Sequence, residues 1–257
     1  MGNRKKEIDE TVNSFNKESF IIENFRMILS YKIKYNGRFF HCFRVERLIK
    51  SILFSRSWID SSSKSDPPPD FHNEKHHIMM EIMRVDDGAG GKHSPNSFER
   101  KEKYMQKHYG KDYKKMFKGC SLYFTPDTRN DLEYNFKSYL KNFDRVVTDH
   151  SNKVDNYHQN YPKCKTCVFL IFDESNAYYQ KTDNSESMLL HQCFYDLKFV
   201  EIIKRCNADY VIWFTFYKTV FDKNSKEIKQ PYAVIYDVKR IKQNCFEYNH
   251  EKMIKVK

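Results

Sequence analysis

The sequence predicts an α/β fold, with a central mixed β-sheet flanked by helices, from three observations. Two apolar runs, 168–172 and 211–217, have the continuous hydrophobicity of strands buried on both faces. A helix is expected between them at 188–206. The segment 131–157 repeats buried-type residues at spacings of three and four, which predicts a long helix ended by Pro162. That stripe consists of Phe136, Leu140, Phe143, Val147, His150, Val154 and Tyr157.

The order of these segments requires crossover connections, and crossovers place helices on the faces of a sheet. The chain has 257 residues, of which 40% are hydrophobic and 16% aromatic, enough for one substantial core. We divide it into a peripheral N-terminal segment at 1–38, a single α/β domain at 39–240 and a basic C-terminal tail at 241–257. A last strand is expected at 232–238.

The cysteines and the hydropathy pattern bear on the compartment. Seven cysteines are scattered through a chain too long to need disulfides, which indicates reduced thiols. A hydrophobic segment typical of a signal peptide is not apparent, and no apolar run approaches the roughly 18 residues of a membrane span. The expectation is therefore a cytoplasmic or otherwise intracellular protein, not secreted, with no membrane partner.

The formal net charge of +11 predicts attraction to polyanions. Nucleic acid, either DNA or RNA, is the natural partner, because lysine and arginine neutralise phosphates. A lysine-rich surface that only increases solubility is the alternative.

A β-hairpin preceded by a helix is expected in the first half of the domain. Apolar residues at 40–54 follow helical spacing. Three prolines at 67–69 then hold the backbone extended. A strand starting at Asp70, a polar turn at 72–75 and a second strand at 77–85 complete the hairpin. A helix at 97–109 and a short strand at 120–124 follow.

Two carboxylates lie across this hairpin. Residues two apart in a strand share a face, so Glu81 and Met83 point the same way, and pairing can set Asp70 beside Glu81. Adjacent carboxylates repel, and a divalent cation relieves the repulsion. Oxygen ligands favour Mg²⁺ or Mn²⁺. The alternative is that Asp70 is a turn residue and Glu81 an exposed edge charge, although the apolar neighbours of Glu81 indicate a buried strand.

Pro69-Asp70, followed after ten residues by Glu81-Ile82-Met83 in an apolar strand, resembles the core motif of the PD-(D/E)xK nuclease superfamily, which has the restriction-endonuclease-like fold. The resemblance covers about residues 40–217. It implies a Mg²⁺- or Mn²⁺-dependent nuclease, acting as an endonuclease or an exonuclease, in which Asp70 and Glu81 bind the metal and the Ile82 main-chain carbonyl is a candidate third ligand. Glu46 falls where many members place another acidic ligand. A homodimer is also compatible, since many endonucleases cut both strands as dimers.

The chain departs from the family at Met83, which occupies the position of a lysine that orients the attacking water. A thioether cannot do this, and members lacking the lysine often use a residue of the next helix. Lys153 is the preferred substitute, followed by Lys141 and Lys92. The departure leaves open a degenerate member that binds nucleic acid or a protein without cleavage, or one that uses the fold only as an interaction scaffold.

A basic stretch interleaved with tyrosines follows the hairpin, and is either a solvated helix face or a track for a phosphate backbone. The glycine cluster at 86–94 does not have the spacing of a phosphate-binding Walker loop and indicates a flexible loop. The residues assigned to nucleic-acid binding are Lys92, Lys101, Lys103, Lys107, Lys114 and Lys141.

Three smaller features have alternatives. Cys164 and Cys167 form a C-x2-C pair, which is either half of a zinc site or two ordinary thiols. Histidines at 72, 76 and 77 in the hairpin turn either contact phosphate or are solvated. Asp173 and Glu174, at the end of an apolar run, are interpreted as a turn.

Overall fold

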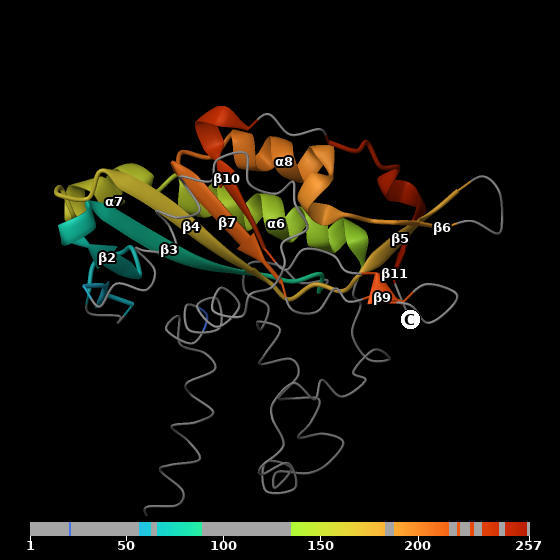
Figure 1. Cartoon of the computed structure of the whole chain (residues 1–257), viewed down its shortest axis with the longest axis horizontal. Coiled ribbons are helices and arrows are strands. Elements are labelled where there is room, and N and C mark those ends of the chain that lie inside the picture. Colours follow the sequence, from blue (N-terminus) through green and yellow to red (C-terminus); the bar gives the residue numbers. More distant parts are fainter. Residues whose placement is uncertain are drawn as a thin grey trace, which may run out of the picture.

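The computed structural model describes residues 21, 57–62, 66–88, 135–182, 188–215, 220–221, 227–228, 233–241 and 245–255. Its centre is a six-stranded mixed sheet with helices packed against it (Figure 1), which confirms the predicted α/β class with a central mixed sheet. Within the described residues, no helix is long and apolar enough to cross a bilayer.

The strand order in the central sheet is β1-β2-β3-β4-β7-β10. The pairs β1–β2, β2–β3 and β7–β10 are antiparallel, whereas β3–β4 and β4–β7 are parallel. Parallel neighbours need crossover connections, and α6 and α8 supply them. The strands are β1 (Ile59–Asp60), β2 (Phe71–Asn73), β3 (Ile78–Val85), β4 (Thr166–Asp173), β7 (Tyr210–Phe214) and β10 (Ala233–Asp237).

The hairpin of β2 and β3 is confirmed, with its turn two residues later than predicted. The turn is the 3₁₀ helix η1 (Glu74–His76), whose N-cap Asn73 accepts a hydrogen bond from the His76 N–H at 3.2 Å. His77 follows in the left-handed region at φ 55°, which turns the chain into β3. The polar composition of this segment predicts a turn, but it does not show that Asn73 caps a 3₁₀ helix or that His77 adopts a left-handed conformation.

The predicted single helix at 131–157 is wrong, because the structure contains two helices, α6 (Phe136–Ser151) and α7 (Val154–Asn160). Asn207 ends α6: its N–H donates to the Ser151 hydroxyl at 2.9 Å and its side chain donates to the Ser151 carbonyl at 3.2 Å. Carbonyls at a helix end lack partners within the helix, and here a distant residue supplies one. Tertiary contact therefore overrides a continuous pattern.

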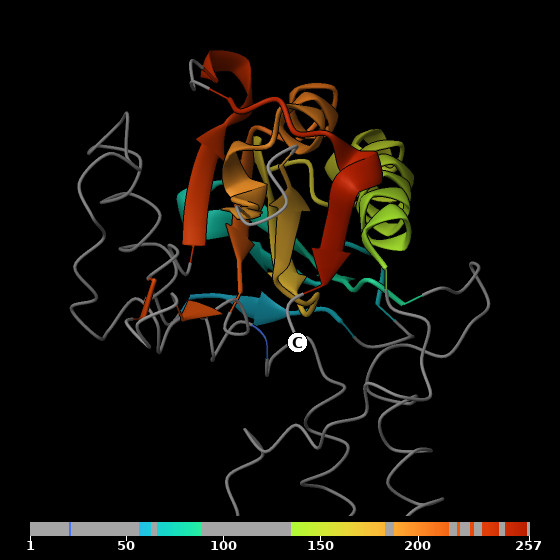
Figure 2. The same cartoon turned by 90° about the vertical axis from the view of Figure 1, so that its right-hand side faces the viewer.

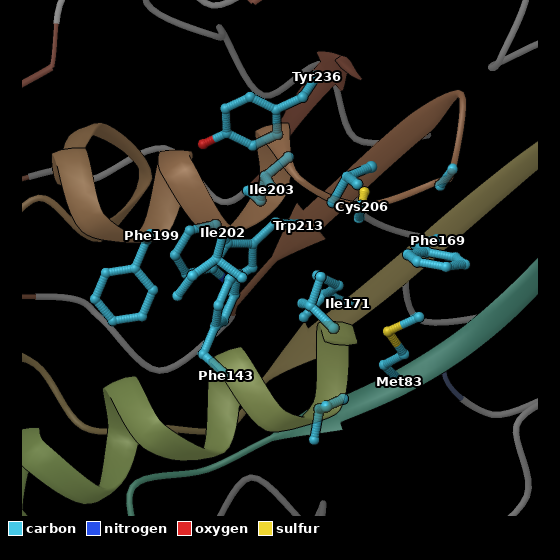
Figure 3. Packing of buried hydrophobic residues seen from close by; sticks show 14 of the residues in the cluster. Met83, Phe143, Phe169, Ile171, Phe199, Ile202, Ile203, Cys206, Trp213 and Tyr236 are labelled. Atoms are coloured by element: carbon cyan, nitrogen blue, oxygen red, sulfur yellow. The ribbon is translucent and has the colours of Figure 1, made fainter. Parts of the chain in front are cut away.

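Each face of the sheet carries its own apolar cluster. On one face, alternate residues of the strands pack against α6 and α8 (Leu197–Lys204), as Figures 1 and 2 show. Figure 3 shows part of this cluster, in which Phe143 of α6 and Phe199 of α8 lie close to Trp213 of β7. The opposite face packs Ile78, Met80 and Ile82 with Ile21. The two-residue alternation thus decides which side chains meet the helices.

The helix predicted at 188–206 is also wrong in its first half. Met188 to Leu190 form a strand, β6, and η2 (Cys193–Tyr195) precedes α8. Asp196 caps α8, accepting a hydrogen bond from the Lys198 N–H at 2.9 Å. Because this cap fixes where the helix begins, the apolar residues before it are free to form other structure.

A second, three-stranded sheet has the order β11-β5-β6, and its members are β5 (Tyr178–Lys181), β6 (Met188–Leu190) and β11 (Met253–Lys255). The segment 245–255, expected as part of a tail, contains the 3₁₀ helix η4 (His250–Lys252) and β11, which pairs with β5. The remaining elements are the short pair β8 (Val220–Phe221) and β9 (Glu227–Ile228), and η3 (Val238–Arg240).

Several predictions lie outside the described residues. These are the elements expected at 40–54, 97–109 and 120–124, the glycine cluster beyond residue 88, and the residues Glu46, Lys92, Lys101, Lys103, Lys107 and Lys114. The strands predicted at 168–172, 211–217 and 232–238 are confirmed by β4, β7 and β10 within the described range.

Candidate functional site

Asp70 lies directly before β2, at the end of the proline loop. Hydrogen bonds from the Tyr161 hydroxyl (2.9 Å) and the Asn160 side chain (2.7 Å) hold the first two carbonyls of Pro67–Pro69. Ser61 donates its hydroxyl to the third carbonyl and its N–H to the Asp70 carbonyl, each at 2.7 Å. The loop is thus fixed to the end of α7 on one side and to Ser61 on the other, which determines where the Asp70 carboxylate lies.

Glu81 lies in the middle of β3 and faces the helix layer. Its neighbours two positions away, Met79 and Met83, belong to the cluster that packs against α6. Only 7% of the Glu81 side chain is exposed. A carboxylate buried to this extent is costly unless hydrogen-bonded or paired, so its partners indicate its role.

Main-chain N–H groups hold both carboxylates in place, one from each side of the hairpin. The Asp70 N–H donates to Glu81 Oε2 at 3.3 Å, and the Ile82 N–H donates to Asp70 Oδ2 at 2.8 Å. β2 pairs with β3 only from Phe71 onward, so the Asp70 side chain takes the place of a ladder acceptor for Ile82. The predicted approach of Asp70 and Glu81 across the hairpin is therefore present in the structure.

The helix side adds two residues that the sequence analysis included only in the apolar stripe. His150, in the last turn of α6, places Nδ1 2.7 Å from Glu81 Oε1. The same nitrogen is 3.3 Å from the Tyr157 hydroxyl of α7. Burial, together with the charge of Glu81 and a hydrogen bond to it, raises the pKa of Tyr157 far above its ordinary value. The sequence feature that could have indicated this contact is a histidine within an otherwise apolar helical stripe that packs against a strand containing a glutamate.

The donor atoms of this site fit a hard divalent cation in kind. Asp70 and Glu81 provide carboxylate oxygens, and the N–H and carbonyl of one strand residue point to the same side, so the Ile82 carbonyl faces the edge where Asp70 lies. Such oxygens are the ligands that Mg²⁺ and Mn²⁺ prefer. In the described part of the chain, no group of three or more His, Cys, Asp and Glu side chains is placed to hold a metal ion. The fit is thus to two carboxylates and one main-chain oxygen.

Met83, at the position where the nuclease resemblance implies a lysine, is only 2% exposed within the helix-side cluster, where it appears in Figure 3. A lysine at this position would place its charged ammonium group in an apolar environment, which is energetically costly. The position is therefore a packing position in this chain.

The two predicted lysines that the structure describes are both exposed. Lys153 lies in the turn between α6 and α7, and Lys141 lies on α6. For neither side chain is a hydrogen bond or ion pair present among the described residues. The residue of the following helix that contacts Glu81 is His150.

The alternative metal and phosphate candidates are distributed elsewhere. Cys164 and Cys167 are fully buried free thiols, and burial raises the pKa of both. His72 is buried and stacked on Tyr161 with ring centroids 4.1 Å apart, and burial lowers its pKa. The other two turn histidines, at 76 and 77, are exposed.

Asp173 is not a turn residue as predicted: it is the last residue of β4 and fully buried. Its carboxylate accepts hydrogen bonds from the Tyr139 hydroxyl (2.6 Å), Trp213 Nε1 (3.0 Å) and both the N–H and hydroxyl of Ser175. The neighbouring Asp87 is also fully buried. A polar pair after an apolar run is common in turns. The sequence did not show that aromatic donors from other elements stabilise the buried Asp173 carboxylate.

Comparison with family models, curated proteins and solved structures finds no match for this chain.

Proposed function

We propose that this chain is a metal-dependent nuclease with a restriction-endonuclease-like core, which hydrolyses phosphodiester bonds in DNA or RNA. The observation that carries the proposal is the pair of main-chain contacts that holds the two carboxylates together: the Asp70 N–H donates to Glu81, and the Ile82 N–H donates to Asp70. In this proposal the two carboxylates and the Ile82 carbonyl hold Mg²⁺ or Mn²⁺. The ion, when bound, polarises the phosphodiester and lowers the pKa of the attacking water.

The arrangement around the carboxylates supports the proposal. The hairpin of β2 and β3, the crossover helix α6 and the parallel strand β4 follow one another in the order that the nuclease core requires. The net charge of +11 favours a polyanionic substrate. Exposed Lys153 and Lys141 are proposed to contact substrate phosphate from the solvent side.

A binding-only function is the second candidate, and the burial of Met83 at the lysine position favours it. Such a protein binds nucleic acid through the same basic surface without cutting it. Cleavage by the purified protein separates the two candidates.

The test is Mn²⁺-dependent cleavage of fluorescently labelled DNA and RNA by the full chain and by Asp70→Asn and Glu81→Gln. We expect each variant to lose about 1000-fold in rate, because metal stabilisation of the transition state amounts to several kcal/mol.

Glu74→Gln is the matched control, since Glu74 is an exposed carboxylate on η1 that pairs with Lys163 at 2.8 Å. It should cleave like the wild type. Equal cleavage by all four proteins contradicts the assignment of the site. Salt-dependent oligonucleotide binding without any cleavage by the wild type would favour the binding-only function.

A further inference from the structure

The contact between Glu81 and His150 defines which ring nitrogen carries a proton. An ionised carboxylate only accepts hydrogen bonds, so Nδ1 of His150, 2.7 Å from Glu81 Oε1, is the donor. The Asp70 N–H donates to the other oxygen, Oε2. Each Glu81 oxygen therefore has an N–H donor, with the Tyr157 hydroxyl as a further hydrogen-bond partner of the carboxylate.

His150 and Tyr157 are seven residues apart and lie on either side of the break between α6 and α7. In the structure the Tyr157 hydroxyl is 3.3 Å from His150 Nδ1, and Tyr157 is fully buried. The contacts of Asn207 with Ser151 hold the break, so the fold brings both side chains to Glu81.

His150 and Glu81 differ in how far their side chains are exposed to solvent. The His150 side chain is 24% exposed, compared with 7% for Glu81. His150 is thus the more exposed partner of this contact. Met83, at the position where the nuclease resemblance implies a lysine, is buried among apolar side chains.

We propose that His150 is a positioning residue that holds the Glu81 carboxylate in the orientation needed to bind the divalent cation. This inference rests on the proposed function, because it concerns the same metal. Hydrogen-bonded neighbours of metal ligands fix the ligand's orientation, and losing one typically weakens metal binding 10- to 100-fold.

The test is isothermal calorimetry of the full chain titrated with Mn²⁺ alone. His150→Ala should bind Mn²⁺ about 10- to 100-fold more weakly than the wild type. His150→Asn should stay within about 3-fold, because its amide nitrogen lies where Nδ1 was and restores the donor. His150→Gln carries its amide one bond further and should resemble the alanine variant, so the Asn and Gln pair decides the matter even where alanine disturbs folding.

His158→Ala is the matched control, because the one hydrogen bond of His158 among the described residues joins its Nδ1 to the Cys164 carbonyl at 3.0 Å. It should bind Mn²⁺ like the wild type. Equal affinity of wild type and both His150→Ala and His150→Gln overturns the inference, as does an asparagine variant as weak as the alanine variant.

Glu81→Gln separates the two claims. If it abolishes Mn²⁺ binding while His150→Ala leaves binding intact, the inference fails and the proposed function stands. A wild type that binds no Mn²⁺ overturns both.

Discussion

Glu81 and Asp173 are buried carboxylates on adjacent parallel strands, and both face the helix layer, but their partners differ. Asp173 accepts hydrogen bonds from a tyrosine, a tryptophan and a serine, which are all neutral donors. Glu81 lies beside a second carboxylate, Asp70, and a partly exposed histidine. The two positions are four residues apart along the sheet, about 13 Å.

The difference shows how burial alone fails to identify a functional carboxylate. At Asp173 the donors satisfy the charge, and burial is complete. Such a group stabilises the fold by linking β4 to α6 and β7. At Glu81 a second carboxylate, that of Asp70, lies alongside, and paired carboxylates are typical of a site that binds a cation.

The largest effect on stability is expected from Asp173→Ala. The change leaves the Tyr139 hydroxyl and the Trp213 indole N–H buried without their acceptor. Each orphaned donor costs about 1–3 kcal/mol, so we expect a loss of about 4 kcal/mol in the free energy of unfolding, measured by urea denaturation.

Glu81→Gln is the matched comparison and should change the free energy of unfolding by no more than about 1 kcal/mol, since the amide keeps the shape of the side chain and its NH2 group can donate to His150 Nδ1 when the ring takes its other tautomer. If Glu81→Gln destabilises the protein as much as Asp173→Ala, Glu81 is a structural carboxylate and the contrast between the two is lost.

A smaller, pH-dependent effect is expected from a third carboxylate, Asp196. Its Oδ2 accepts hydrogen bonds from His191 (2.8 Å) and His250 (2.7 Å). Burial acts to raise the pKa of Asp196, but the hydrogen bonds and charges of the two histidines outweigh it and lower the pKa. A lowered pKa means that the folded state binds fewer protons than the unfolded state in this range, so stability rises with pH.

The contribution of Asp196 is therefore fully present above the unfolded aspartate pKa of about 3.9 and lost as the pH falls through the lower folded value. Urea midpoints between pH 6 and pH 3 should fall less steeply in Asp196→Asn than in the wild type. Asp60→Asn, at an exposed position, serves as the control. Parallel curves for all three proteins would show that the histidine contacts do not stabilise the Asp196 charge.

The sequence predicted the sheet better than the helices, for a physical reason. A strand buried on both faces, such as β4, has a continuous apolar run that few other structures produce. Helix ends depend on caps from distant residues, as with Asn207 at the end of α6, and these leave no local pattern. The β6 strand was missed because its short apolar run continues into the pattern of α8.

Of the candidate site, the sequence predicted Asp70 beside Glu81, since strand pairing follows from the hairpin. It did not predict His150, because a histidine in an apolar stripe resembles a core residue until the strand opposite is known. The search for a lysine led instead to Lys153, three residues further along, which the helix break leaves in an exposed turn.

A crystal structure of the protein grown with Mn²⁺, with anomalous scattering to locate the ion, would show directly whether Asp70 and Glu81 bind a cation. We predict a single strong peak between the Asp70 and Glu81 carboxylates, next to the Ile82 carbonyl, with His150 still hydrogen-bonded to Glu81. A peak at Asp173 or elsewhere, with none between Asp70 and Glu81, would contradict the account.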